Sequence, residues 1–500
     1  MANITSANWN YDTAAHLLLR AGFGHNGKLI RATGDAYQAR VFANLGPDKT
    51  VDYLLTMRPW PAQGPGTLNT DNDYDFNRLT YWWISVMRGT TTPVREKMTL
   101  FLHGHFATAR SKIDKTLYLA KQNKLFRTFA IGDFRELVKQ VTIDPAMLWW
   151  LDGQLNKVGR PNENYARELQ ELFTLGVFDF NGNHNYSQND VVQAARILTG
   201  WRVNEVGGRY YSINPVFTPS RHDSGSKTMF APVAGETPLQ NPANQFTAPA
   251  NYNPATDEYK MLVDKIFDHV DTEGRPTAAR FITRKLWKFF AYDPEVDYGT
   301  PRSDLTMIDE LADEFKNSGY SLKALLRAMF LREEFYADRT RTVKGPTEYL
   351  VGSLRMLYAK FAGNELIYVG DRLKAMGQTL FDPPNVKGWD GNQAWITSQG
   401  LLKRFEFARD VASGDTSRYS LIGWYPLYFL DTKATTRQAV VDRFLKLLGP
   451  LQVDVATNTQ LLAWLGATDQ DMHLTDPDYV NINIRGLVNL ILTLPQYHVH

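Results

Sequence analysis

Apolar residues recur at intervals of three and four along most of this chain, which is the pattern of amphipathic helices. This periodicity predicts helices over residues 14–24, 75–89, 93–108, 131–153, 161–176, 187–201, 257–270, 277–292, 305–319, 321–336, 347–363, 365–381, 437–449 and 481–497, the one over 131–153 being broken near Asp144-Pro145. Asp75 is placed to cap the second of these helices, and Pro93 occupies the favoured first position of the third. Either Ser187 or Asn189 is placed to cap the helix over 187–201.

Residues 202–255 have a different pattern, in which polar and apolar residues alternate and Gly, Ser and Pro are frequent. This segment predicts a hairpin turn at Gly207 and Gly208, followed by a long irregular excursion. Loops of this length in a compact domain are usually functional or mobile. The predicted fold class is therefore mainly α: a large multi-helix assembly with a small β-hairpin or irregular insertion around 202–255.

A chain of 500 residues is too long for one simple core, so we expect several sub-domains or one large helical assembly. The patterns divide it into four regions. Residues 1–201 form an N-terminal helical region, 202–255 the irregular β-rich insertion, 256–410 a second helical region, and 411–500 a C-terminal helical segment. The second helical region ends in the loop FDPPNVKGW.

The composition excludes several classes of protein. The formal charge of +2 gives no electrostatic argument for a nucleic-acid partner, and no run of 18 apolar residues predicts a membrane span. Cysteine is absent, which excludes disulfides, thiolate nucleophiles and Cys-ligated metals. Aromatic residues reach 13%, a supply that suits sugar or polymer contacts as well as a core. The N-terminal residues lack the pattern of a secretory signal.

The segment PNENYARELQELFTLG (161–176) is the first candidate for chemistry. A helical wheel places Tyr165, Leu169, Leu172 and Phe173 on an apolar stripe. Its polar residues fall on two sides: one edge of the stripe carries Asn164, Glu168 and Glu171, and the opposite side carries Glu163 and Arg167. The simplest interpretation is an exposed helix with a Glu163–Arg167 ion pair. The alternative is that Glu168, which borders the core, projects into a site.

Three further segments carry polar side chains that could serve a site. His103 and His105 flank Gly104 and could converge on one metal if the helix ends there, although a buried and an exposed histidine would explain the pair as well. His222 beside Asp223 could supply a base and its orienting group, or be solvated loop charge. The loop 381–395 offers Lys387, Trp389 and Trp395 for a pocket mouth, or acts as a structural clamp.

Taken together, these segments resemble the bacterial domain-of-unknown-function family numbered 1800. The segments that carry the resemblance are AHLLLRAGFG, TLFLHGHFAT, ENYARELQELFTLGV, ARILTGW, the HD-x-G-x-K pattern and FDPPNVKGW. The family's usual tryptophan and asparagine around the histidine pair are replaced here, giving Leu-His-Gly-His at 102–105. The resemblance implies a helical, exported protein of the periplasm or extracellular space, whereas the missing signal leaves a cytoplasmic location open.

The family motifs fall on titratable residues, which favours an active site over a scaffold. The first hypothesis is a metal-dependent enzyme of unknown substrate, with oxidoreductase chemistry preferred over hydrolysis. His103, His105, Glu163 and Glu168 would bind divalent iron, manganese or zinc. The catalytic residues would be His222, Asp223, Arg167 and Lys227, with Lys387, Trp389 and Trp395 binding substrate.

The second hypothesis is a non-catalytic cell-surface protein. Its aromatic residues and the insertion around 202–255 would engage a polysaccharide or a protein partner, and the charged motif residues would form a structural ion-pair network. A metal that persists after both histidines are replaced would contradict the first hypothesis. The absence of any glycan or protein ligand would contradict the second.

Overall fold

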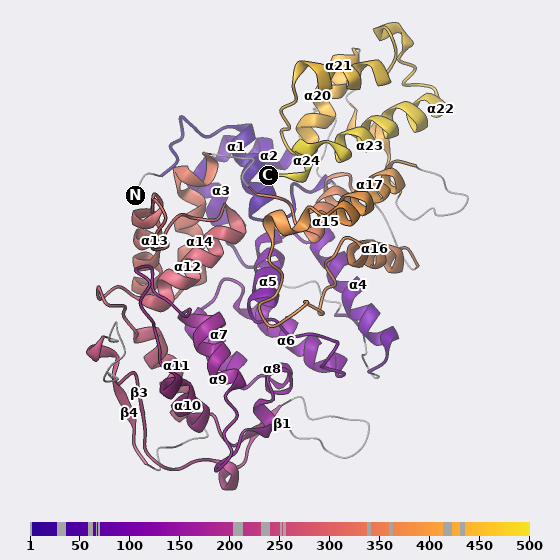
Figure 1. The fold of residues 1–500 in the computed structure, drawn as a ribbon. Coiled ribbons are helices and arrows are strands. Elements are labelled where there is room, and N and C mark those ends of the chain that lie inside the picture. The colour runs from indigo at the N-terminus through magenta and orange to yellow at the C-terminus, as the bar shows by residue number, and fades with distance from the viewer. Residues whose placement is uncertain are drawn as a thin grey trace.

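The computed structural model describes residues 3–27, 37–58, 64–66, 68, 71–203, 214–231, 241–250, 253, 257–337, 342–359, 364–413, 423–430 and 436–500. It confirms a mainly helical chain with a small β insertion (Figure 1).

The N-terminal region consists of short and medium helices. They are α1 (Tyr11–Arg20), α2 (Tyr37–Leu45), α3 (Pro47–Leu54), α4 (Asp73–Gly89), α5 (Pro93–His105), α6 (Thr116–Phe129), α7 (Phe134–Thr142), α8 (Pro145–Trp150), η2 (Gly153–Leu155), α9 (Asn164–Glu168), the π-helix η3 (Leu169–Thr174) and α10 (Gln188–Ile197). Pro93 begins α5 and Ser187 caps α10, as predicted. The predicted cap of α4 was wrong, because Asn72 rather than Asp75 caps this helix and accepts the Asp75 N–H.

The insertion forms two small antiparallel sheets. Strand β1 (Trp201–Val203) pairs with β2 (Pro215–Phe217), and β3 (Lys227–Met229) pairs with β4 (Phe246–Ala248). Two 3-10 turns, η4 (Pro219–Arg221) and η5 (Pro242–Asn244), lie between strands. The predicted turn at 207–208 lies outside the described residues, although the strands on either side of it pair as a hairpin would require. Strand β3 packs on α10, which ties the insertion to the helices.

The remainder of the chain is helical again. Its helices are α11 (Tyr259–Asp268), α12 (Thr277–Phe290), α13 (Leu305–Asn317), α14 (Leu322–Leu331), η7 (Glu333–Tyr336), α15 (Pro346–Met356), α16 (Asn364–Ala375), η8 (Asn392–Trp395), α17 (Ser398–Ser413), α19 (Pro426–Phe429), α20 (Arg437–Leu447), α21 (Val455–Trp464), η9 (Asp469–Asp471), α22 (Pro477–Tyr479), the π-helix η10 (Val480–Ile484), α23 (Arg485–Thr493) and α24 (Pro495–His498). None of the helices within the described ranges is both long and apolar enough to cross a membrane.

Helix α5 lies in the middle of the molecule (Figure 1). Every one of its residues except Gly104 is buried. A helix buried on all sides normally lacks charge, but α5 carries two charged residues that are paired, and Arg95 donates to the carbonyl of Arg58. Glu96 binds the guanidinium of Arg127, and Lys97 binds Glu348 of α15. These buried pairs fix the position of α5 and therefore of the two histidines at its C-terminal end.

The C-terminus returns to the N-terminal helices (Figure 1). Arg20 of α1 donates from Nη1 to the carbonyl of His500 at 2.7 Å, and Val343 forms an antiparallel bridge with Val499. Buried apolar residues from all four predicted regions belong to one core cluster. The division into four regions stays a prediction.

Candidate functional site

The segment PNENYARELQELFTLG changes helix type at its centre. It is α-helical through Glu168 and then becomes the π-helix η3, in which the N–H groups of Leu175 and Gly176 both donate to the carbonyl of Gln170. Gly176 follows with φ +79°, a conformation that favours glycine. Gln170, which the wheel leaves off the apolar stripe, is fully buried. Single π-turns within helices occur frequently at functional sites because they redirect side chains.

The two histidines of α5 are both buried, and neither faces solvent. Nε2 of His103 accepts the backbone N–H of Phe381 at 2.9 Å, and its ring packs between the aromatic rings of Trp83, Phe381 and Trp389. Nε2 of His105 donates to the carbonyl of Phe173 at 3.1 Å. Because α5 stays helical through His105, the two rings contact different segments. Burial lowers the pKa of His103 to about 3, so its ring is neutral.

The loop that contains FDPPNVKGW covers the end of α5. Gly388 has φ +82°, and a Cβ at this position would lie 2.2 Å from the carbonyl oxygen of Gly104. Trp389 packs over Gly104 and His103. Trp395 is half-buried and lies beside Gly345. Gly388 and Gly104 therefore allow the loop backbone to touch the helix, and Trp389 packs against both Gly104 and His103. The pocket-mouth and clamp interpretations of this loop both stay predictions.

This loop brings Lys387 into the electrostatic neighbourhood of Glu168. Burial and the adjacent carboxylate of Glu171 raise the pKa of Glu168, while Arg167 and Lys387 lower it. Tyr186 donates from its hydroxyl to Oε2 of Glu171 at 3.3 Å, and its pKa is raised by burial and by that carboxylate. All five side chains are half-buried or exposed, so solvent and solutes can reach them. We refer to Arg167, Glu168, Glu171, Tyr186 and Lys387 as the Glu168 cluster.

Arg167 is also paired with Glu163, so it takes part both in this ion pair and in the electrostatic surroundings of Glu168. Arg167 binds Oε2 of Glu163 at 3.1 Å, and Gln188 of α10 donates to the same oxygen at 2.8 Å. The Glu163 and Arg167 side chains are 36% and 38% exposed, which makes this a surface ion pair. Such pairs contribute at most about 1 kcal/mol to stability.

The HD-x-G-x-K motif forms a buried ion triad with a residue that sequence reasoning missed. Oε2 of Glu258 lies 2.9 Å from Nε2 of His222, and Oε1 of Glu258 lies 2.7 Å from Nζ of Lys227. All three side chains are at most 4% exposed. Asp223 does not orient His222, because its carboxylate binds the guanidinium of Arg196 in a bidentate pair at 2.8 and 3.2 Å. That pair lowers the pKa of Asp223.

The hydrogen bonds around His222 determine where its protons lie. The hydroxyl of Thr199 donates to the carbonyl of Arg196 at 2.7 Å and accepts the N–H of Asp223 at 2.8 Å. The carbonyl of Thr199 can only accept, so Nδ1 of His222, 2.9 Å away, carries a proton. Nε2 of His222 lies 3.4 Å from Nζ of Lys227, whose ammonium can donate to it.

The structure groups some of the predicted site residues and separates others. Glu168, Arg167 and Lys387 come together, as do His222 and Lys227. The predicted metal ligands His103 and His105 contact different segments, and Glu163 lies on the outer side of its helix. Within the part of the chain that the structure describes, no three His, Asp or Glu side chains are grouped so as to hold a metal ion. A metal site built from His103, His105, Glu163 and Glu168 stays a prediction.

Two participants were missed because their signals are weak in the sequence. Glu258 precedes α11 and looks like an ordinary acidic residue at a helix start. Tyr186 lies between Asn185 and Ser187, directly before a well-capped helix. Only the tertiary fold shows that each faces a motif residue.

The chain matches a known family over nearly its whole length. A family model described as "Protein of unknown function (DUF1800)" matches residues 16–499. No curated protein and no solved structure matches the chain. Since the matched range covers nearly the whole chain and confirms the resemblance seen in its motifs, the protein belongs to the DUF1800 family.

Proposed function

We propose that the protein is an enzyme whose acid–base site is the Glu168 cluster. The observation that carries the proposal is the pairing of two nearby carboxyl groups, one of which is half-buried and holds its proton more tightly than usual. A carboxyl group whose pKa is raised suits general acid catalysis, with the second carboxylate as base or electrostatic partner.

The surrounding residues supply the other functions of such a site. Arg167 and Lys387 would hold an anionic or strongly polar group of the substrate at the edge of the carboxyl pair. Tyr186, which is bonded to Glu171, would orient that carboxylate. The π-helix gives a structural reason for the arrangement, because it turns Glu171 relative to Glu168. This chemistry belongs to hydrolytic or group-transfer reactions rather than to the oxidative class preferred from sequence.

The test is a substrate screen combined with variants of the two glutamates. 4-Nitrophenyl glycosides, esters and phosphates are the probes. Glu168→Gln should lower kcat by about 10²–10⁴-fold on any substrate that the protein turns over. Glu314→Gln, which alters a half-buried glutamate on α13, is the matched control and should retain activity. Absence of turnover, or turnover that survives Glu168→Gln, would contradict the proposal.

The pH profile gives a readout that a structural role would not change. Glu171→Gln removes a negative neighbour, so the pKa of Glu168 falls and the basic limb of the profile moves to lower pH. Lys387→Met removes a positive neighbour, so this limb moves to higher pH. Shifts in the same direction, or no shift, would show that Glu168 is not the catalytic acid.

The metal-dependent form of the hypothesis is tested separately. Elemental analysis for iron, manganese and zinc would be made on protein purified without added metal. The His103→Ala/His105→Ala double variant should lose the metal if the histidines bind it. If the metal content is unchanged in this variant but lost in Glu168→Gln, the metal is bound by the Glu168 cluster and not by the histidines.

A binding or assembly protein is the second candidate, and one observation favours it. The charged residues of the HD-x-G-x-K motif are paired internally: His222 and Lys227 with Glu258, and Asp223 with Arg196. Paired charges of this kind suit a scaffold that presents a polysaccharide-binding or protein-binding surface at an exported location. Glycan-array binding that survives Glu168→Gln, without turnover of any probe, would favour this candidate over the enzyme.

A further inference from the structure

Two short hairpins with the same sequence pattern meet beside helix α12. Residues 179–183 read DFNGN and residues 271–275 read DTEGR, so both follow Asp-x-x-Gly-x. In each loop, Oδ1 of the aspartate accepts the N–H groups of the second and fourth following residues, at 2.9 and 2.8 Å. The two glycines have φ +84° and +79°. Both aspartates are therefore held in one orientation by their own loops.

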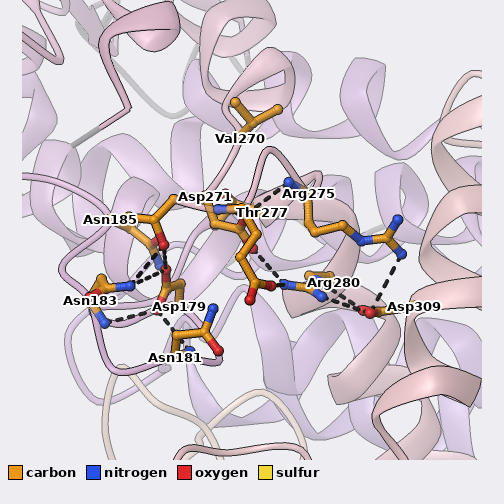
Figure 2. Close-up of polar contacts among 12 residues, drawn as sticks. Asp179, Asn181, Asn183, Asn185, Val270, Asp271, Arg275, Thr277, Arg280 and Asp309 are labelled. Atoms are coloured by element: carbon orange, nitrogen blue, oxygen red, sulfur yellow. Dashed lines mark hydrogen bonds and ion pairs between the residues drawn. The ribbon is translucent and has the colours of Figure 1, made fainter. Parts of the chain in front are cut away.

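The hairpins also contact each other directly. Thr272 donates from its hydroxyl to Oδ2 of Asp179 at 3.2 Å and accepts from Nδ2 of Asn183 at 2.8 Å. Figure 2 shows the asparagines at 181, 183 and 185 gathered around Asp179, with Asp271 next to them. These bonds fix the two loops relative to one another.

Arg280 of α12 completes this polar group (Figure 2). It donates from Nη1 to Asp271 at 2.5 Å, and from Nε and Nη2 to the two carboxylate oxygens of Asp309 at 2.6 and 2.7 Å. The Arg280 and Asp271 side chains are 4% and 1% exposed. A guanidinium has five N–H donors. Arg280 therefore retains N–H groups that these three hydrogen bonds do not use.

A cavity of about 230 Å³ lies against these groups. One wall is the segment 175–180 that follows the π-helix, and the other is the face of α12 that carries Thr277, Arg280, Phe281 and Arg284. The lining combines three carboxylates, two guanidiniums and three phenylalanine rings: Asp179, Asp271, Asp297, Arg280, Arg284, Phe178, Phe180 and Phe281. Phe178 is 55% exposed.

The charges of this lining nearly balance, and each guanidinium is already bonded to a carboxylate. Arg280 binds Asp271, and Arg284 binds Asp297 through both oxygens. A phosphate would meet three carboxylates and a divalent cation would meet two guanidiniums, so neither suits the cavity. A fitting ligand is uncharged, both donates and accepts hydrogen bonds, and has an apolar face for the phenylalanine rings.

We propose that this cavity binds one neutral sugar ring. Hydroxyl groups of a sugar donate to carboxylates and accept from guanidinium N–H groups, and the C–H face of the ring packs on an aromatic side chain. The volume is below the roughly 300–1,000 Å³ of pockets for drug-sized ligands, which suits a single ring. The polar groups are fixed before the ligand arrives, so binding costs little side-chain ordering. The site uses no residue of the Glu168 cluster and stands independently of the proposed function.

Isothermal titration calorimetry of the full chain tests this assignment. The probes are the methyl glycosides of glucose, galactose and mannose, N-acetylglucosamine, inorganic phosphate and Ca²⁺. Phe178→Ala removes the exposed aromatic face, and Arg284→Met replaces a guanidinium with an apolar group of similar length. We expect at least one neutral sugar to bind and each variant to weaken it by about tenfold, equivalent to about 1.4 kcal/mol.

Tyr425→Ala is the matched control, because Tyr425 is an aromatic residue that is 75% exposed elsewhere on the chain. This variant should bind the sugar as the unaltered protein does. The assignment is overturned if no neutral sugar binds, if phosphate or Ca²⁺ binds and is lost in the two cavity variants, or if the sugar affinity is the same in all three variants. Circular dichroism of each variant confirms that the fold is retained.

Discussion

The buried ion triad gives the sharpest prediction about how the β insertion is held. Glu258 contacts His222 and Lys227 at once, and both contacts are shielded from solvent. We consider Glu258→Gln, a change that keeps the size of the side chain and its ability to bond to both neighbours. The amide can donate to Nε2 of a neutral imidazole and accept from the ammonium. The substitution therefore removes charge from the triad without removing its hydrogen bonds.

The free-energy cost of Glu258→Gln follows from the burial of the pair. The Lys227 and Glu258 side chains are each 1% exposed and their charged atoms lie 2.7 Å apart. Removing one partner of a buried pair leaves an uncompensated charge and costs about 3–5 kcal/mol. Because the triad ties β3 to the start of α11, we expect this cost to lower the free energy of local unfolding of the insertion. A tenfold change corresponds to about 1.4 kcal/mol, so amide exchange there should accelerate by roughly 10²–10³·⁵-fold.

Hydrogen–deuterium exchange measured by mass spectrometry on peptides covering 214–231 and 241–250 is the assay. Asp313→Asn is the matched control, because it removes a carboxylate that is 42% exposed and paired with Arg275. A surface pair contributes at most about 1 kcal/mol, so this control should change exchange by less than about fivefold. The Lys227→Met/Glu258→Leu double variant should lower the free energy of local unfolding less than Glu258→Gln does, because it leaves no buried charge unpaired. Exchange in Glu258→Gln within fivefold of the unaltered protein would refute the reasoning.

Three further predictions follow from the core. Gly388→Ala should destabilise the protein by about 2–4 kcal/mol in urea unfolding, because its Cβ would overlap the carbonyl of Gly104 and its φ is positive; an unchanged midpoint would contradict the close packing. Burial lowers the pKa of His103 to about 3. This histidine therefore becomes protonated below about pH 6.5 in the unfolded chain, but only near pH 3 in the folded chain. The free energy of unfolding should therefore fall as the pH is lowered across that window. His103→Gln should reduce the slope of the unfolding free energy against pH by about 1.4 kcal/mol per pH unit. Equal slopes in the variant and the unaltered protein would contradict this prediction. Burial lowers the pKa of Lys344 to about 7, so its contribution to stability rises as the pH increases from 7 towards 10.5. Lys344→Met should raise the thermal midpoint more at pH 6 than at pH 10. The reverse order would show that burying the charged ammonium of Lys344 does not destabilise the fold.

Much of the helical architecture could be predicted from local sequence. The apolar period of 93–108 and Pro93 predict α5, and the capping pattern at Ser187 predicts α10, because helix starts depend on residues within one turn. The mixed pattern of 202–255 likewise predicts an insertion that is not helical, and paired strands are found there.

The tertiary structure decided which side chains meet. Nothing near Glu168 in sequence indicates Lys387, and nothing near His222 indicates Glu258, since both pairings depend on how distant segments pack. The π-turn after Glu168 was also not predicted, because the helical wheel assumes α-helical spacing throughout the segment. Periodicity records which face of an element is apolar, whereas the partner on that face is chosen by the packing of the whole chain. The composition and local patterns of this protein therefore determined its helices and its candidate residues, and the fold alone determined which of those residues face one another.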